Sequence, residues 1–168
     1  MNNNKKKLEH LIEFYKINIE AYRFQINLNW NRNKFYITLN SSLIGVACGL
    51  LRIPGFQFAE FLTAPLFILG LFTSFLGLQA LLKGIEYRRR TILKKTEIET
   101  ELAKYLSVSS IDTTAGMREA KLSLDEQEKF VTRLPRFGTI SFFLAALFVA
   151  LMILNAVALG YLFYLKEI

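Results

Sequence analysis

Residues 35–82 decide the fold of this chain: they read FYITLNSSLIGVACGLL (35–51), RIPGFQFAE (52–60) and FLTAPLFILGLFTSFLGLQALL (61–82). The first and third segments carry no charged residue, and as α-helices they extend about 26 Å and about 33 Å. A bilayer's hydrocarbon core is about 30 Å thick, so each segment can cross it, the shorter one with Lys34 and Arg52 snorkelling to the interfaces. The pattern predicts a transmembrane helical hairpin.

A third uncharged run, 137–165, is longer than either span of the hairpin. Of the 168 residues, 52% are hydrophobic and 21% are charged, and the charges concentrate between the apolar runs. This distribution is typical of a small polytopic membrane protein. We expect an all-α membrane protein with four parts: a cytoplasmic N-terminal helix (1–34), the two-span hairpin (35–82), a cytoplasmic helical region (83–136) and a third transmembrane helix (137–165).

The distribution of basic residues predicts the topology. Residues 1–34 hold seven Lys/Arg and residues 83–136 hold twelve, whereas the 52–60 loop and the 166–168 tail hold one each. Cytoplasmic segments carry the excess of Lys and Arg. We therefore expect a cytoplasmic N-terminus and central segment, with the 52–60 loop and the C-terminus outside. No cleaved signal peptide is expected, because some 30 polar residues precede the first apolar run.

The N-terminal segment has the spacing of a coiled-coil seam. Apolar residues recur at alternating intervals of four and three, and Asn29 and Asn33 continue the spacing in polar form. No Gly or Pro interrupts residues 8–44, so one helix is expected to run from the cytoplasm into the first span. We expect this seam to drive self-association, since it would otherwise expose an apolar stripe to water. Its members are Leu8, Ile12, Tyr15, Ile19, Tyr22 and Ile26.

Three short segments are expected to interrupt or restart helices. Pro54-Gly55 is a turn dipeptide in the outer loop, and residues 107–116 form the strongest loop candidate. Ser123-Leu-Asp-Glu126 matches a capping box that would start a further helix. Pro65 is expected within the first turn or so of the second span, where its missing N–H matters least.

The sequence offers little for catalysis or metal binding. It has no paired carboxylates in an apolar setting, no Gly-rich phosphate loop and no nucleophile elbow. One Cys and one His cannot build a zinc site or a disulfide framework, and charged neighbours flank His10. We expect no enzyme activity, no catalytic residue, no metal and no cofactor.

Small and polar residues inside the spans are the best candidates for a site, because lipid penalises polar groups that face it. They form two stripes, each on one helical face: either pore lining or close helix packing in the hairpin, packing being favoured. Asn155, near the middle of the third run, is expected either to hydrogen-bond another helix or to line a pore, the hydrogen bond being favoured. The stripes consist of Thr38, Ser42, Gly45 and Gly49 in the first span and Gly70, Ser74 and Gly77 in the second.

A dense basic cluster follows the second span. A stop-transfer signal and anchor for anionic lipid is sufficient to explain it. The alternative is a pocket for a phosphorylated ligand, which a ring of subunits would concentrate. Aromatic interleaving is limited to Tyr87, so no DNA binding is expected. The cluster consists of Arg88, Arg89, Arg90, Lys94 and Lys95.

The order of these segments resembles a known family. An aromatic and basic helix runs straight into the hairpin, and the second span continues into the charged stretch from Glu86-Tyr-Arg-Arg-Arg90 to Glu101. Over roughly residues 8–106 this layout resembles the SLATT family, the two-span membrane effectors of bacterial conflict systems such as Hailong-type anti-phage defence. Residues of the first helix that carry the likeness are Tyr15, Tyr22, Arg23 and Trp30.

The resemblance implies a pore in the bacterial inner membrane, held closed until an infection signal opens it and depolarises the membrane. That signal is often a nucleotide or oligonucleotide, here from a partner nucleotidyltransferase. The third run and the 107–136 insert depart from the two-span pattern, so only the general architecture carries over.

We therefore expect a homo-oligomeric, nucleotide-gated ion channel of abortive infection, with a tetramer favoured over other subunit counts. Two other classes of protein remain open. A non-conducting anchor or scaffold would recruit a cytoplasmic partner through its coiled-coil stalk. A holin-like lysis protein would form a pore without any ligand.

Overall fold

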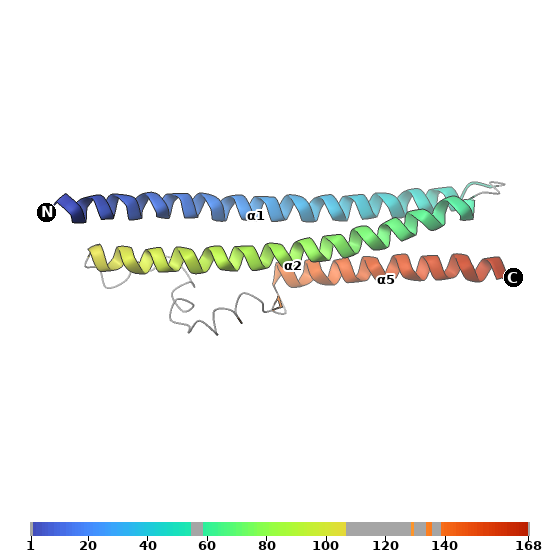
Figure 1. Ribbon diagram of the computed structural model, residues 1–168. Coiled ribbons are helices and arrows are strands. Elements are labelled where there is room, and N and C mark those ends of the chain that lie inside the picture. The colour runs from blue at the N-terminus through green and yellow to red at the C-terminus, as the bar shows by residue number, and fades with distance from the viewer. Residues whose placement is uncertain (1, 55–58, 107–128, 130–133, 136–138, 168) are drawn as a thin grey trace. The chain divides into compact units, whose positions relative to one another are not determined.

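The described part of the chain forms three long helices. The structure, a computed structural model, describes residues 2–54, 59–106, 129, 134–135 and 139–167. Helix α1 spans Asn2–Leu51, α2 spans Ala59–Leu106 and α5 spans Ile140–Glu167 (Figure 1). Each is long and apolar enough to cross a membrane, and the described residues include no strand. The predicted all-α membrane protein is confirmed.

The helix ends follow from local sequence. Helix α1 continues without a break past residue 44 and ends at Leu51, three residues before Pro54. Just after its end, Arg52 N donates to Gly49 O at 3.2 Å. Helix α5 begins after Thr139, whose hydroxyl accepts a hydrogen bond from Phe142 N at 3.2 Å as an N-cap. Helix α2 starts at Ala59, so Pro65 lies inside the helix beyond its first turn.

The lengths of α1 and α2 exceed a bilayer. With 50 and 48 residues, they extend about 75 Å and about 72 Å. The hydrocarbon core takes up about 30 Å of such a length, so the charged parts of both helices lie outside it. Helix α5, with 28 residues, extends about 42 Å, close to the full thickness of a bilayer.

The chain divides into two compact units. The first, named the cytoplasmic unit after its predicted location, comprises the described residues of Met1–Leu28 and Lys83–Leu134. The membrane unit comprises those of Asn29–Leu82 and Pro135–Ile168. Helices α1 and α2 therefore each contribute residues to both units.

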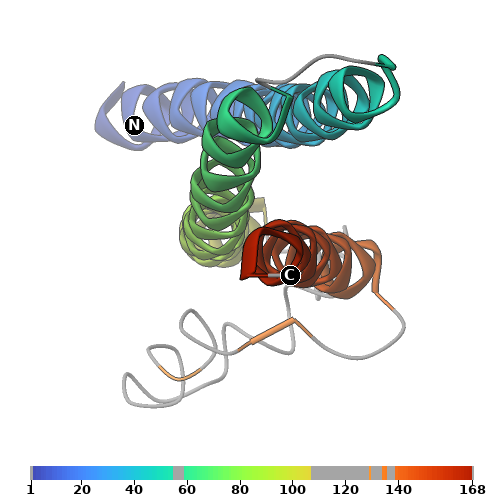
Figure 2. The same ribbon diagram turned by 90° about the vertical axis from the view of Figure 1, so that its right-hand side faces the viewer.

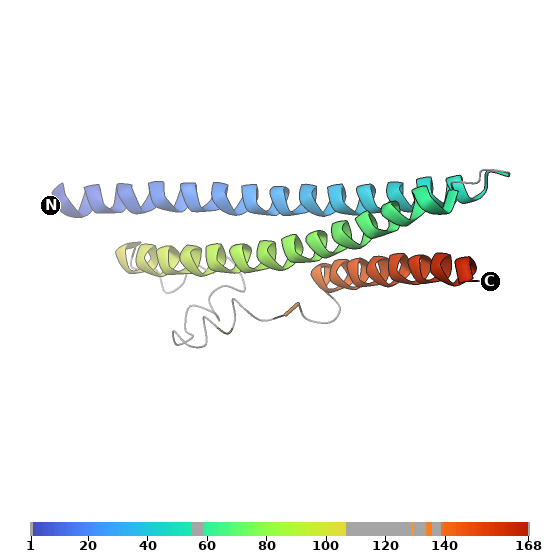
Figure 3. The same ribbon diagram turned by 45° about the vertical axis from the view of Figure 1, so that its right-hand side comes forward.

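All three helices contribute to the core of the membrane unit. Ala47 of α1, Phe67 of α2 and Leu162 of α5 form a buried cluster, against which Ala158 and Leu159 also pack. Helix α5 runs beside α2 in this unit (Figures 1 and 3), and its C-terminal end points toward the viewer in Figure 2. The third run is thus a packed member of the membrane unit.

Three sequence expectations lie wholly or partly outside the described residues. They are the loop at 107–116, the capping box at 123–126 and the part of the outer loop from residue 55 to residue 58.

Candidate functional site

Helix α1 presents two opposite faces in the membrane unit. The seam of alternating three- and four-residue spacing continues through Asn33, Asn40 and Ala47, which are all buried. The predicted stripe of Thr38, Ser42, Gly45 and Gly49 is exposed, and a Cβ added at either glycine would meet nothing within 4 Å. At about 100° per residue, the stripe lies roughly half a turn away from the buried seam. The first-span stripe therefore points away from α2 and α5.

The second-span stripe faces inward instead. Ser74 is completely buried, and a Cβ on Gly70 would lie 2.7 Å from Asn155 Cγ. A Cβ on Gly77 would lie 2.7 Å from Phe148 Cζ. Gly70 and Gly77 are seven residues apart, as are Phe148 and Asn155. The two glycines of α2, which have no side chain, therefore leave room for these two side chains of α5. The small residues of α2 thus serve close packing within the chain.

A buried polar cluster joins the three helices. Asn40 Nδ2 of α1 donates to Gly70 O of α2 at 2.6 Å, and it also lies within hydrogen-bond distance of Thr73 Oγ1, at 3.1 Å, and of Ser74 Oγ. Asn155 Nδ2 of α5 donates to Asn40 Oδ1 at 3.2 Å and to Leu151 O at 2.7 Å. Of the two roles considered for Asn155, the structure shows the hydrogen bond to another helix. Such a bond pairs Asn155 Nδ2 with Asn40 Oδ1 away from lipid, whereas Asn155 Oδ1 is buried without a hydrogen-bond partner among the described residues.

Asn40 and Thr73 belong to neither predicted stripe. Thr38 and Ser42, two residues to either side of Asn40, form the first-span stripe on another face. A usable signal was nonetheless present: the spacing that runs through Asn29 and Asn33 reaches position 40 after one further heptad. Extending the seam into the span would have placed Asn40 on the packed face.

The predicted oligomer seam lies against α2 in the cytoplasmic unit. Tyr15 hydroxyl donates to Glu99 Oε1 at 2.8 Å, and Lys95 Nζ lies 3.5 Å from the same carboxylate. Leu8, Ile19 and Tyr22 are half-buried, whereas Ile12 and Ile26 are 41% and 39% exposed. Most of this seam is covered within the chain. Exposure to water is therefore no reason to expect self-association through it.

We expect Tyr15→Phe to lower the free energy of unfolding by about 1.5 kcal/mol, because it removes a hydrogen bond to a buried carboxylate. Thermal unfolding of the detergent-solubilised protein, followed by circular dichroism, measures the loss. Tyr22→Phe is the matched control, since the Tyr22 hydroxyl has no hydrogen-bond partner among the described residues. Equal loss in the two variants would mean that the Tyr15 hydroxyl is not stabilising.

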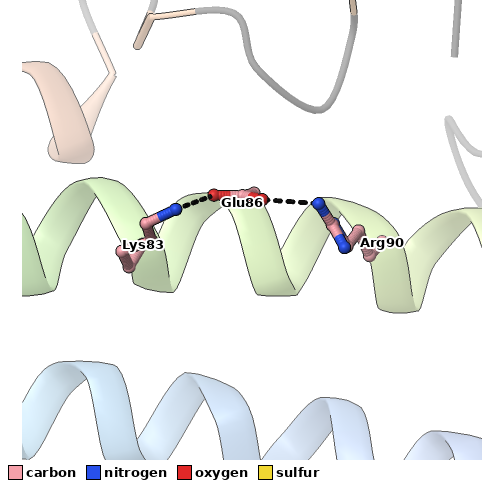
Figure 4. Close-up of polar contacts among 3 residues, drawn as sticks. All are labelled: Lys83, Glu86 and Arg90. Carbon is pink, nitrogen blue, oxygen red and sulfur yellow. Dashed lines mark hydrogen bonds and ion pairs between the residues drawn. The ribbon is translucent and has the colours of Figure 1, made fainter. Parts of the chain in front are cut away.

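The basic cluster does not converge on one point. Arg90 and Lys83 both pair with Glu86, at 2.7 Å and 2.9 Å (Figure 4), and Lys94 is exposed. Arg88 and Arg89 are half-buried, and Arg88 Nε is buried without a hydrogen-bond partner among the described residues. Lys95 pairs with Glu99, as described above. Helical periodicity directs Arg88 and Lys95 to one side and Arg90 and Lys94 to another.

Glu86 is ionised at neutral pH and pairs with Lys83 and Arg90. The hydrogen bond from Lys83, followed by the charges of Lys83 and Arg90, lowers the pKa of Glu86 from its ordinary value of 4.5, against a smaller opposing effect of desolvation. A lowered folded pKa means that these pairs stabilise above the ordinary value and that this contribution is lost as the pH falls through the folded pKa. The positive charge of Arg90 is therefore partly compensated under physiological conditions.

One comparison with known proteins gave a match. Residues 12–158 match the model described as Octameric membrane protein family (8xMP). The matched region begins near the N-terminal end of α1 and ends within α5, so it includes parts of all three helices. No curated protein and no solved structure matches the chain. The match supports a membrane-protein family, but not the SLATT family specifically, and it treats the third helix as part of the common architecture.

Proposed function

This chain belongs to the Octameric membrane protein family (8xMP), and we propose that eight copies assemble into an ion-conducting pore lined by α1. The tetramer favoured from the sequence is not supported, and the family's name leans against it. Conduction would need several copies, since one chain of three helices has too little polar surface to enclose a conduit.

The exposed stripe of α1 is the observation that carries this proposal. Thr38, Ser42, Gly45 and Gly49 lie within a membrane span yet are exposed, and a Cβ on either glycine would meet nothing within 4 Å. Exposed apolar side chains suited to lipid lie on the other two helices; they include Phe61, Leu69 and Phe72 on α2 and Phe143, Ile153 and Val157 on α5. Facing the stripe to a water-filled lumen and these apolar side chains to lipid avoids the cost of placing the polar groups of the stripe in hydrocarbon.

The subunit number sets the width of such a pore. Eight helices spaced about 9 Å apart on a ring leave a lumen roughly 14 Å across, whereas four leave roughly 3 Å. An octamer lined by α1 alone would thus pass hydrated ions and small solutes with little selectivity. A pore of this width would collapse the membrane potential once opened.

In the cell, this pore acts as an effector of bacterial anti-phage defence. The chain sits in the inner membrane with its N-terminus in the cytoplasm and its C-terminus outside, in keeping with the excess of Lys and Arg in residues 1–34 and 83–136. A nucleotide signal acting on the cytoplasmic unit opens the pore; the resemblance in layout to SLATT effectors supports this gating. No catalytic step and no cofactor enter the proposal.

Ion flux from liposomes tests conduction. We expect Ser42→Phe to reduce flux at least tenfold, because each copy would add an aromatic ring to the lumen. Ala156→Phe is the matched control: it adds the same ring at an exposed position of α5, which faces lipid in this arrangement, and flux should stay unchanged. A small-molecule extract of phage-infected cells supplies the signal. Native mass spectrometry verifies that both variants keep the wild-type number of subunits.

The same measurement separates the alternative functions. Flux without any extract would indicate a holin-like protein that needs no signal. No flux under either condition would contradict the pore and leave the membrane scaffold. Equal flux in the Ser42 and Ala156 variants would show that the α1 stripe does not line the conduit.

A further inference from the structure

The cytoplasmic part of α1 carries a second apolar seam. Phe14, Ile17, Ala21, Phe24 and Leu28 recur at alternating intervals of three and four residues, the spacing of a coiled-coil interface. Unlike the seam through Tyr15, this one is open in the chain: Phe14 and Phe24 are 62% exposed and Ile17 is 56% exposed.

The two seams lie on different faces of the helix. At about 100° per residue, the second seam is roughly a third of a turn away from the side on which Tyr15 and Tyr22 face α2. Charged, exposed residues at positions 16, 20 and 23 place this part of α1 in water and not in hydrocarbon. A row of two exposed Phe and one exposed Ile in water, continued by half-buried Leu28, marks an interaction surface.

We infer that the α1 helices of neighbouring copies pack on this second seam as a parallel bundle. This inference rests on the octameric assembly proposed above and not on conduction. All copies of a membrane protein with one topology insert in the same direction, so their α1 helices run parallel.

The residues that flank the seam suit a parallel arrangement. With Phe14 and Ala21 at a positions and Ile17 and Phe24 at d positions, Glu13 and Glu20 occupy g positions, and Asn18 and Gln25 occupy e positions. In parallel bundles a g residue meets the e residue five positions later on the neighbouring helix. Glu13 then meets Asn18 of the neighbour, and Glu20 meets Gln25. Both are carboxylate–amide pairs that can hydrogen-bond, and no two like charges face each other.

Cysteine cross-linking of the full-length protein tests the contact. In a Cys48→Ser background, which removes the one native cysteine, Phe24→Cys should give disulfide-linked copies on mild oxidation in native membranes. A bond requires Cα atoms within about 7 Å, so Arg23→Cys, one residue away on the exposed surface, should give none. Failure of Phe24→Cys to cross-link more than Arg23→Cys would overturn the inference.

The assembled mass provides a second test. We expect the Ile17→Glu/Phe24→Glu double variant to lose the octameric mass in native mass spectrometry, whereas Lys16→Glu, at an exposed position beside the seam, keeps it. Circular dichroism confirms that the helices remain. If the double variant keeps the wild-type mass, the seam is not the subunit contact. A wild-type protein that is not octameric would instead refute the proposed assembly itself, so the two failures are distinguishable.

Discussion

Gly77→Ala is expected to displace α5 from the membrane unit. The added Cβ would lie 2.7 Å from Phe148 Cζ, closer than carbon atoms approach in folded proteins. Phe148 is completely buried, so its ring has no free space into which it can move. Overpacking of this kind costs about 3 kcal/mol, and the gain of about 1 kcal/mol from replacing glycine in a helix offsets only part of it. We expect a net loss of about 2 kcal/mol.

Gly45→Ala is the matched control for this substitution. It adds the same methyl group to another glycine in a membrane span, but nothing lies within 4 Å of the new Cβ. The folded chain should therefore keep or slightly increase its stability. Thermal unfolding in detergent, read by circular dichroism at equal subunit number, compares the two. If both variants unfold at the same temperature, α5 is not held against Gly77.

A second substitution should partly reverse the effect. Phe148→Leu shortens the side chain that meets the new methyl group, so Gly77→Ala/Phe148→Leu should be more stable than Gly77→Ala alone. Rescue by this change, and not by Phe143→Leu on the exposed face of α5, would identify the clash as the cause.

The helices could be predicted from the sequence because their causes are local. Residues 35–51 and 61–82 are uncharged over the length of a bilayer, and no breaker interrupts residues 8–44, so span positions and helix continuity follow from composition and length. The stripes could be predicted as faces for the same reason, since helical periodicity alone decides which residues share a side.

The partners of those faces could not be predicted, because they depend on tertiary packing. Periodicity shows that Thr38 and Gly70 each belong to a stripe, but it does not show that one stripe is exposed and the other receives α5. The seam through Tyr15 has the pattern of an oligomer contact. The Tyr15 hydroxyl nevertheless donates a hydrogen bond to Glu99, 84 residues away in the same chain. A seam at coiled-coil spacing gives no indication of whether its partner is the same chain or a second copy.

Removing the amide of Asn155 is expected to destabilise the membrane unit by a comparable amount. Asn155→Leu keeps a similar volume but removes the donor to Asn40 Oδ1, which is buried and would lack that partner. An unsatisfied buried acceptor costs about 1–3 kcal/mol, and hydrogen bonds between membrane helices contribute about 1 kcal/mol. We expect a loss of about 2 kcal/mol from Asn155→Leu and a similar loss from Asn40→Leu.

The double variant distinguishes the hydrogen bond from general disruption. In Asn40→Leu/Asn155→Leu both buried amides are gone and two apolar side chains meet, so the total loss should be smaller than the sum of the single losses by about 1 kcal/mol. Strictly additive losses in thermal unfolding would mean that the two amides do not interact.

The hydrogen bond between Asn40 and Asn155 also affects the proposed pore. Asn40 lies on the face of α1 opposite Ser42, so a hydrogen bond that holds Asn40 against α5 turns Ser42 outward. If α1 lines the conduit, Asn155→Leu should therefore alter ion flux without touching the lumen, whereas Thr73→Val, which removes only one hydroxyl beside Asn40, should alter it less.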